Sequence, residues 1–296
     1  MQQNVSRRPY NHCRYAGNTG DVWKHILLLE ALGPLAKQRQ AAFHYMETHA
    51  GPGYARLGDN GDWRRGVGRF MDGTASALEH PYFELVLPAM QENFLYKGSW
   101  VLVAEWLKRV EHPDFKLTVL EVNADTLKMA ASAIRKGALA PWVKLEPKSG
   151  YDALQKVDAA DFVLIDPPYR SSDGSADDWG RVMDALKRVK AIAQNWMVWY
   201  PIFRRQEPDE LLAVSGGRTF ELLWADDAPG WVMKGCGLAV DEQTYQSLQS
   251  KVEWIEGIAQ SLGGRLGIGA LTAAKTEFSD HVCPPHRTLS YSATYA

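Results

Sequence analysis

The chain has 296 residues, of which 46% are hydrophobic and 23% charged, a composition typical of a globular protein with a substantial core. Its net charge of -2 and sequence pI near 6.5 exclude a protein that is basic overall and coats nucleic acid. Cys13, Cys236 and Cys283 are odd in number and widely spaced, which argues against a disulfide framework and a paired-cysteine metal site.

The amino-terminal segment shows no targeting signal. Residues Met1 to Tyr10 are polar and basic, and no later apolar run approaches the length of a membrane span. We therefore expect a cytoplasmic protein that does not enter a membrane. The first predicted helix is Asp21–Leu35, with Asn18 or Thr19 as its cap.

Short apolar runs that end at polar or turn residues predict the strands of a central sheet. They are Phe43–Met46, Leu117–Leu120, Phe162–Ile165 and Trp196–Tyr200. Helical patterns at Asn123–Arg135 and Asp177–Ala193 follow the second and third strands. The alternation indicates a Rossmann-like, doubly wound and mostly parallel α/β sheet. Phe220–Trp224 and Gly237–Val240 are expected to form a final antiparallel pair.

The segment between the first two strands is longer than a crossover requires. We expect residues 56–112 to form a mainly helical insertion into an α/β domain of residues 1–55 and 113–260. Glycines and the Cys283-Pro284-Pro285 turn predict a poorly packed tail over residues 261–296.

Ligands of such sheets bind at the carboxyl ends of the strands, beside the point where the strand order reverses. Glu47, His49, Glu121 and Asp166 follow strands and are expected at this edge. The turn that contains Gly51 allows close backbone approach to a ligand, and Glu121 can accept both hydroxyls of a ribose. The loop lacks the third glycine of a pyrophosphate cradle, which favours a nucleoside cofactor without phosphates over NAD.

The tetrapeptide Asp166-Pro167-Pro168-Tyr169 directly follows an apolar strand. Two prolines hold the backbone extended, so that the Asp166 carboxylate and the Pro167 carbonyl point at one place beside the Tyr169 ring. These acceptors would hold the hydrogens of an exocyclic amine and leave its lone pair free to attack a methyl donor, while Tyr169 stacks on the base. The motif predicts methylation of an adenine amine.

Several motifs in chain order are similar to the large-subunit ribosomal RNA adenine-N6 methyltransferase J family, whose members are also described as proteins for catabolism of external DNA. The matching segments are Tyr10–His25, Glu47–Gly53, Gly98-Ser99, Glu121, Asp166–Tyr169 and Trp199–Pro201. The resemblance implies a class I methyltransferase that uses S-adenosylmethionine to methylate the N6 amine of adenine in 23S ribosomal RNA. We further expect a partner that is protein-free or partly assembled large-subunit RNA, and no metal ion. The sequence leaves the oligomeric state open, with a monomer favoured.

The resemblance and the local chemistry together assign the site residues. Asp166, Pro167 and Tyr169 are expected to act in catalysis. Cofactor contacts are expected from Lys24, His25, Glu47, His49, Gly51, Ser99, Glu121, Ser149, Gly150 and Asp166. Substrate contacts are expected from Tyr10, His12, Asn18 and Tyr169. Lys24 and His25 lie in the first turns of a helix, where they can hold the cofactor's carboxylate.

Two alternatives stay open at this point. A DNA adenine-N6 methyltransferase would need the same amine-holding motif. A nucleic-acid-binding protein without catalysis is the other, because Ser149 stands where the family pattern has an aspartate. A zinc site at Asp280–His286 is disfavoured, since no second pair of ligands lies nearby.

Basic residues form three groups along this nearly neutral chain. They are Arg7, Arg8 and Arg14; Arg64, Arg65 and Arg69; and Arg204 and Arg205. We expect the first and third groups to contact RNA phosphates without regard to sequence, so that binding weakens as salt rises.

Overall fold

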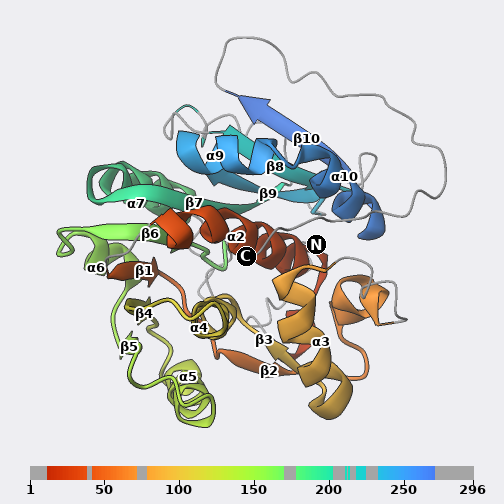
Figure 1. The fold of residues 1–296 in the computed structure, drawn as a ribbon, viewed down its shortest axis with the longest axis horizontal. Helices are drawn as coiled ribbons and strands as arrows, with labels where there is room; N and C mark the ends of the chain where they lie inside the picture. The colour runs from red at the N-terminus through yellow and green to blue at the C-terminus, as the bar shows by residue number, and fades with distance from the viewer. Residues whose placement is uncertain are drawn as a thin grey trace, which may run out of the picture.

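The computed structural model describes residues 12–38, 42–71, 79–169, 178–202, 211, 213, 218–224 and 233–270. An eight-stranded sheet of order β10-β8-β9-β7-β6-β1-β4-β5 spans this part of the chain (Figure 1). Its strands are β1 (Phe43–Glu47), β4 (Phe115–Leu120), β5 (Val143–Glu146), β6 (Ala160–Ile165), β7 (Ala193–Ile202), β8 (Arg218–Leu223), β9 (Gly235–Val240) and β10 (Arg265–Ala270). The strands β5, β4, β1, β6 and β7 run parallel, and β9 lies antiparallel between β7 and β8. The predicted fold class is confirmed, and β5 is a strand that the sequence patterns missed.

Helices cover both faces of the sheet, and the sheet separates two hydrophobic clusters. They are α1 (His12–Tyr15), α2 (Thr19–Gln38), α3 (Pro81–Asn93), α4 (Ser99–Arg109), α5 (Ala124–Lys136), α6 (Gly150–Leu154), α7 (Asp178–Ile192), α9 (Glu242–Gln249) and α10 (Val252–Ser261). Buried residues of α2, α4, α5, α9 and α10 belong to one cluster, and those of α6 and α7 belong to the other. None of the described helices is long and apolar enough to cross a membrane.

Neighbouring residues of the strands alternate between these two clusters. Tyr45 and Leu164 pack with the first cluster, whereas Met46 and Val163 pack with the second. Because successive side chains of a strand point to opposite faces, both faces of a covered sheet must be apolar. This is why the predicted strands appear in the sequence as unbroken apolar runs.

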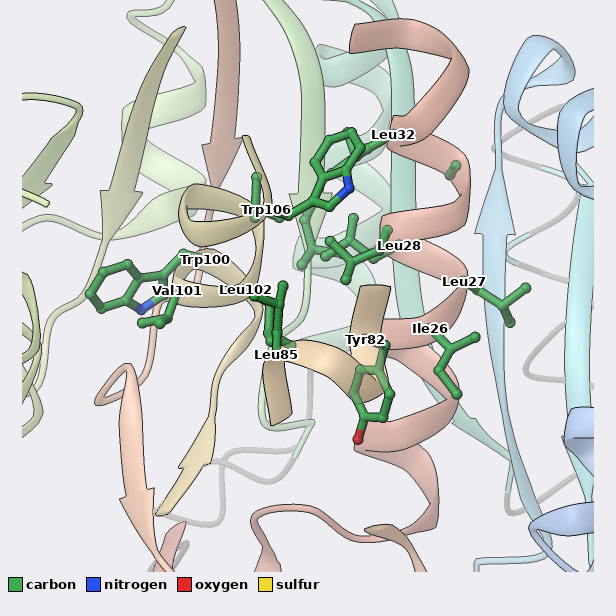
Figure 2. Close-up of a cluster of buried hydrophobic side chains, with 14 of the residues drawn as sticks. Ile26, Leu27, Leu28, Leu32, Tyr82, Leu85, Trp100, Val101, Leu102 and Trp106 are labelled. Carbon is green, nitrogen blue, oxygen red and sulfur yellow. The ribbon is translucent and has the colours of Figure 1, made fainter. Parts of the chain in front are cut away.

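Helix α2 is buried along most of its length and lies against β9, α4 and α9. Its start is capped by Asn18, whose Oδ1 accepts a hydrogen bond from the Asp21 amide at 2.9 Å. Figure 2 shows Leu28 and Leu32 on the side of α2 toward Trp106 of α4, while Leu27 points the other way. A helix that is apolar all round is stable only inside a core.

The segment between β1 and β4 begins with β2 (Tyr54–Arg56) and the 3-10 helices η1 (Asp62–Arg65) and η2 (Val67–Phe70). It continues through α3 and β3 (Leu95–Lys97), which pairs antiparallel with β2, to α4. The described part is mainly helical, as expected. Helix α4 contacts both α2 and β4, so it serves as the crossover helix between β1 and β4. The division of the chain into domains stays a prediction.

The predicted tail is wrong for its first residues. Residues 265–270 form β10, which pairs antiparallel with β8 along its full length. The sequence Arg265–Ala270 alternates glycine with larger residues, which hides a strand from a hydrophobic pattern, and pairing with β8 supplies the missing stability. Residues 271–296, including the disfavoured zinc segment, lie outside the described part.

A buried acidic side chain joins three helical segments at the far end of α2. The Glu30 carboxylate is ion-paired with Lys251, which precedes α10, and its Oε2 lies 3.4 Å from Nε2 of His80 at the start of α3. Burial opposes ionisation of Glu30, but contacts with His80 and Lys251 prevail and lower its pKa from 4.5 to about 2.

Because the folded-state pKa lies below the ordinary value, Glu30 stabilises the protein above pH 4.5, and this contribution disappears as the pH falls toward 2. We predict that Glu30→Gln lowers the free energy of unfolding at pH 7 by roughly 3 kcal/mol. The difference from the wild type should shrink below pH 4.5 in urea titrations. Exposed Glu253 of α10 provides the control, and Glu253→Gln should leave stability nearly unchanged. A pH-independent loss in Glu30→Gln would contradict this role.

Candidate active site

Three acidic residues lie where the parallel strands β1, β4 and β6 end. Glu47 is the last residue of β1, Glu121 follows β4 and Asp166 follows β6. Since β1 pairs in parallel with both β4 and β6, the three residues share one edge of the sheet. The strand order reverses between β1 and β6, which is where ligands of such sheets bind.

The glycine-rich turn after β1 is held tightly at this edge. The Thr48 amide donates to the Leu164 carbonyl of β6, and the Ala50 amide donates to the Leu120 carbonyl of β4. Gly51 and Gly53 have positive φ angles of 62° and 77°, which side chains rarely adopt. A Cβ at Gly53 would also lie 2.3 Å from the Trp100 ring. The turn therefore requires glycine at both positions.

The start of α6 packs directly against this turn. A Cβ at Gly150 would lie 2.2 Å from the Thr48 carbonyl oxygen, so only glycine allows this approach. Ser149 caps α6 and accepts a hydrogen bond from the Asp152 amide at 3.3 Å. Ser149 and Gly150 thus lie beside the turn, and their expected contacts with the cofactor stay predictions.

Glu47 and Ser99 contact each other beneath the turn. The Ser99 hydroxyl donates to Glu47 Oε1 at 2.5 Å, and the Tyr45 hydroxyl donates to Oε2 at 2.7 Å. Burial raises the pKa of Glu47 to about 8, although both hydrogen bonds oppose the shift. Both side chains are buried, so they brace the end of β1 against the start of α4. Their predicted cofactor contacts stay predictions.

Glu121 organises the chain around the end of β4. Its Oε1 accepts hydrogen bonds from the Val122 and Asn123 amides, each at 2.8 Å. Its Oε2 accepts from the Gly51 amide at 3.2 Å. These bonds leave the carboxylate half-buried and open to a ligand beside the glycine-rich turn.

Lys24 connects α2 with the end of β6. Its Nζ lies 2.5 Å from Asp166 Oδ2 and 3.0 Å from Asp21 Oδ1. Burial raises the pKa of Asp166, and the Lys24 ammonium opposes that shift. Asp166 Oδ1 has no hydrogen-bond partner among the described residues. The structure therefore orients one carboxylate oxygen and leaves the other available.

Tyr169 is fixed beside Asp166 by β7 and α7. Its hydroxyl donates to the Trp199 carbonyl at 2.7 Å, and its ring centroid lies 4.8 Å from that of Trp179 and 5.8 Å from that of Trp199, both at a tilt. Its φ of 46° is in the left-handed region, which is unusual for a bulky residue. Held in this way, the ring has a set orientation at the strand end.

The two predicted histidines occupy different settings. His25 of α2 is buried, its Nδ1 lies 2.9 Å from the Tyr96 hydroxyl, and it interacts electrostatically with Lys24 and Asp21. His49 is half-buried, with Nδ1 2.8 Å from the Thr48 hydroxyl. Burial lowers the pKa of each to about 3, so both are neutral at pH 7.

The predicted substrate contacts are only partly within the described residues. Tyr10 lies outside them, and of His12 only the backbone is described, at the start of α1. Asn18 lies beside the site, because a Cβ on Gly20 would come within 3.6 Å of both the Asn18 side chain and the Trp199 ring. Pro167 is buried in the turn after β6.

Sequence reasoning missed several residues at this edge. Asp21 pairs with Lys24 and accepts from the Gly17 amide at 3.0 Å, a role that its position three residues before Lys24 on one helix face could have suggested. Val122 is 67% exposed next to Glu121, where an apolar ring could cover it. The contacts of Trp179 and Trp199 with Tyr169 depend on chain segments that lie far apart, and no local pattern signals them.

This strand order, with acidic residues at the ends of β1, β4 and β6 and an antiparallel β9, defines a Rossmann-like methyltransferase of class I. Residues 40–263 match the family described as "Ribosomal RNA large subunit methyltransferase D, RlmJ", and the chain belongs to this family. Its members are S-adenosylmethionine-dependent methyltransferases.

Two relatives are named Ribosomal RNA large subunit methyltransferase J. The one from Haemophilus influenzae is 29% identical over 216 residues, which cover 67% of this chain and 72% of the relative. The one from Escherichia coli is 29% identical over 214 residues, which cover 67% and 71% of the two chains. A crystal structure of a Legionella pneumophila protein shares the fold, with a TM-score of 0.68, 18% identity, and coverage of 87% of this chain and 99% of that one.

Gly150→Ala should push the glycine-rich turn away from α6, because the new Cβ would overlap the Thr48 carbonyl. We predict a loss of roughly 1 to 3 kcal/mol in unfolding free energy, typical of overpacking, and weaker S-adenosylmethionine binding by calorimetry. Gly33→Ala in α2 is the matched control, since a Cβ there meets nothing within 4 Å. That variant should be as stable as the wild type or more so by up to about 1 kcal/mol. Equal cofactor affinity in both variants would contradict the close approach.

Proposed function

We propose that this chain transfers the methyl group of S-adenosylmethionine to the N6 amine of an adenine in 23S ribosomal RNA. The observation that carries the proposal is the end of β6, where one Asp166 carboxylate oxygen has no hydrogen-bond partner among the described residues and the Tyr169 ring is anchored three residues further on. This acceptor and this aromatic surface lie at the same sheet edge as Glu121 and the glycine-rich turn. The names of the two relatives support ribosomal RNA as the substrate.

The residues after β4 fit the adenosine part of this cofactor. A carboxylate has about four acceptor positions, and three backbone amides occupy three of them on Glu121. The longest bond, from the Gly51 amide, is the one that a second ribose hydroxyl would replace. Exposed Val122 offers an apolar surface to the adenine ring. His49, whose pKa is lowered by burial, is neutral at pH 7 and would add no charge to this part of the site.

The bound cofactor supplies an electrophilic methyl group. Asp166 Oδ1 and the Pro167 carbonyl would accept the two N6 hydrogens and turn the amine lone pair out of the ring plane. With S-adenosylmethionine bound, the lone pair would form the new nitrogen–carbon bond, the electron pair of the broken carbon–sulfur bond would stay on sulfur, and the surplus proton would leave N6 toward Asp166. Burial raises the pKa of Asp166, and the Lys24 ammonium opposes that shift and so favours the ionised carboxylate that this step needs.

Incubation with labelled S-adenosylmethionine and separate ribosomal RNA, DNA and protein fractions tests the proposed function. We expect label in 23S ribosomal RNA, recovered as N6-methyladenosine after digestion to nucleosides. Label in DNA alone would favour the DNA adenine methyltransferase. Absence of label in every fraction, with intact cofactor binding, would favour a protein that binds nucleic acid without catalysis.

Substitutions of Glu121 and of Asp166 should affect different steps, the first cofactor binding and the second methyl transfer. We predict that Glu121→Ala weakens S-adenosylmethionine binding by roughly 1 to 3 kcal/mol, the cost of lost charge-assisted hydrogen bonds. Asp166→Ala should keep most of the affinity and lose turnover, and Asp166→Asn serves as its isosteric partner. Calorimetry and single-turnover methylation measure the two effects. An Asp166→Ala enzyme with near wild-type turnover would exclude the proposed role of Asp166 in methyl transfer.

Substitutions of Tyr169 separate stacking from anchoring. We predict that Tyr169→Ala weakens RNA binding first, since stacking is worth roughly 1 to 3 kcal/mol per base. Tyr169→Phe should keep the stack and lose only the hydrogen bond to the Trp199 carbonyl, so that turnover falls by about threefold to tenfold, equivalent to roughly 1 kcal/mol. RNA titrations under single-turnover conditions distinguish the two. Equal effects of both substitutions on RNA affinity would exclude stacking.

A further inference from the structure

Four exposed arginines gather where the insertion meets the start of α2. Arg14 lies on α1, Arg64 and Arg65 on η1, and Arg69 on η2, and we call these four residues the arginine surface. Both α1 and α2 contact η1, so the group comes from segments that are separate in the sequence. Within the described ranges, no acidic side chain forms an ion pair with any of the four, although two aspartates lie in the same segment as η1.

Two of these side chains are oriented before any ligand arrives. The Arg64 guanidinium lies 4.7 Å from the centre of the Trp63 ring, and its Nε donates to the Asp59 carbonyl at 3.0 Å. Arg69 Nε donates to the Arg65 carbonyl at 2.8 Å. Each bond uses the inner nitrogen Nε. The terminal nitrogens of Arg69 lie against Gly263, where a Cβ would come within 2.9 Å of them. A guanidinium held in this way loses less rotational freedom when it binds a phosphate.

The arginine surface is joined to the segment that carries Lys24. The Val67 amide donates to the Gly17 carbonyl at 3.0 Å, and the Thr19 hydroxyl donates to the Arg65 carbonyl at 3.0 Å. A Cβ on Gly66 would lie 2.2 Å from the Gly17 carbonyl oxygen, so the two segments are in direct contact. With 1.5 Å per helical residue, Lys24 lies about 8 Å along α2 from Thr19. The surface is therefore joined to α2 less than two helical turns before Lys24, which pairs with Asp166.

We propose that the arginine surface binds the phosphate backbone of the RNA strand that flanks the target adenine. This inference rests on the proposed function, since it takes the nucleic acid at Asp166 to be RNA. A chain of net charge -2 lacks a general attraction for RNA, so a local surface must provide it. Guanidinium groups suit phosphate because they donate two parallel hydrogen bonds. These contacts hold the strand in place without reading its sequence.

The test is a triple variant, Arg64→Gln, Arg65→Gln and Arg69→Gln, measured against a protein-free 23S ribosomal RNA transcript. Each phosphate contact contributes about 0.7 to the slope of log affinity against log salt for a single strand, so the slope should fall by about 2. RNA affinity at moderate salt should fall by roughly 10- to 100-fold. S-adenosylmethionine affinity, melting temperature and turnover at saturating RNA should stay as in the wild type.

A second triple variant, Lys156→Gln, Lys187→Gln and Lys190→Gln, removes the same charge from exposed positions near α6 and α7, on the other face of the sheet. It should bind RNA almost as the wild type does. An unchanged salt slope in the arginine variant, or an equal loss in both variants, would overturn the inference. Binding is measured without turnover, so a wild type that binds RNA through these arginines but methylates none would overturn the proposed function alone.

Discussion

The buried ammonium of Lys24 is the contact on which the arrangement of the site depends. It lies between Asp21 of its own helix and Asp166 at the end of β6. Charges removed from water are costly unless they are paired, so any shift of α2 along the sheet would leave a carboxylate or the ammonium uncompensated. The position of α2 thus determines the orientation of the Asp166 carboxylate, to which we assign the proton-accepting role in the proposed reaction.

Helix α2 can impose this position because it is itself held from several sides. Its apolar side chains are buried against α4 and the strands, and Trp23 donates to the Phe220 carbonyl of β8 at 3.3 Å. At its other end Glu30 connects it to the start of α3 and to Lys251. The position of α2, and through Lys24 that of Asp166, therefore depends on how the insertion and the C-terminal strands pack against this helix.

The insertion contributes to function through the same helix. The turn that contains Gly66 lies on the residues before α2, and the arginines that surround it face solvent near the predicted position of the substrate strand. Attraction for an anionic partner is thereby concentrated at one place, which lets the rest of the surface stay near neutrality.

The sequence by itself determined the elements whose signals are local. Apolar runs that end in polar residues located β1, β4, β6 and β7, and the Asp166–Tyr169 tetrapeptide identified the chemistry, because backbone restriction by proline acts within a few residues. The tertiary structure decided the contacts between distant segments: Lys24 meets Asp166 across 142 positions of the chain. The tertiary structure also decided the strand β10, the burial of His25 and the grouping of arginines from α1, η1 and η2. These features depend on which segments pack together, and pairing across such separations is selected by the energy of the whole core rather than by any local preference.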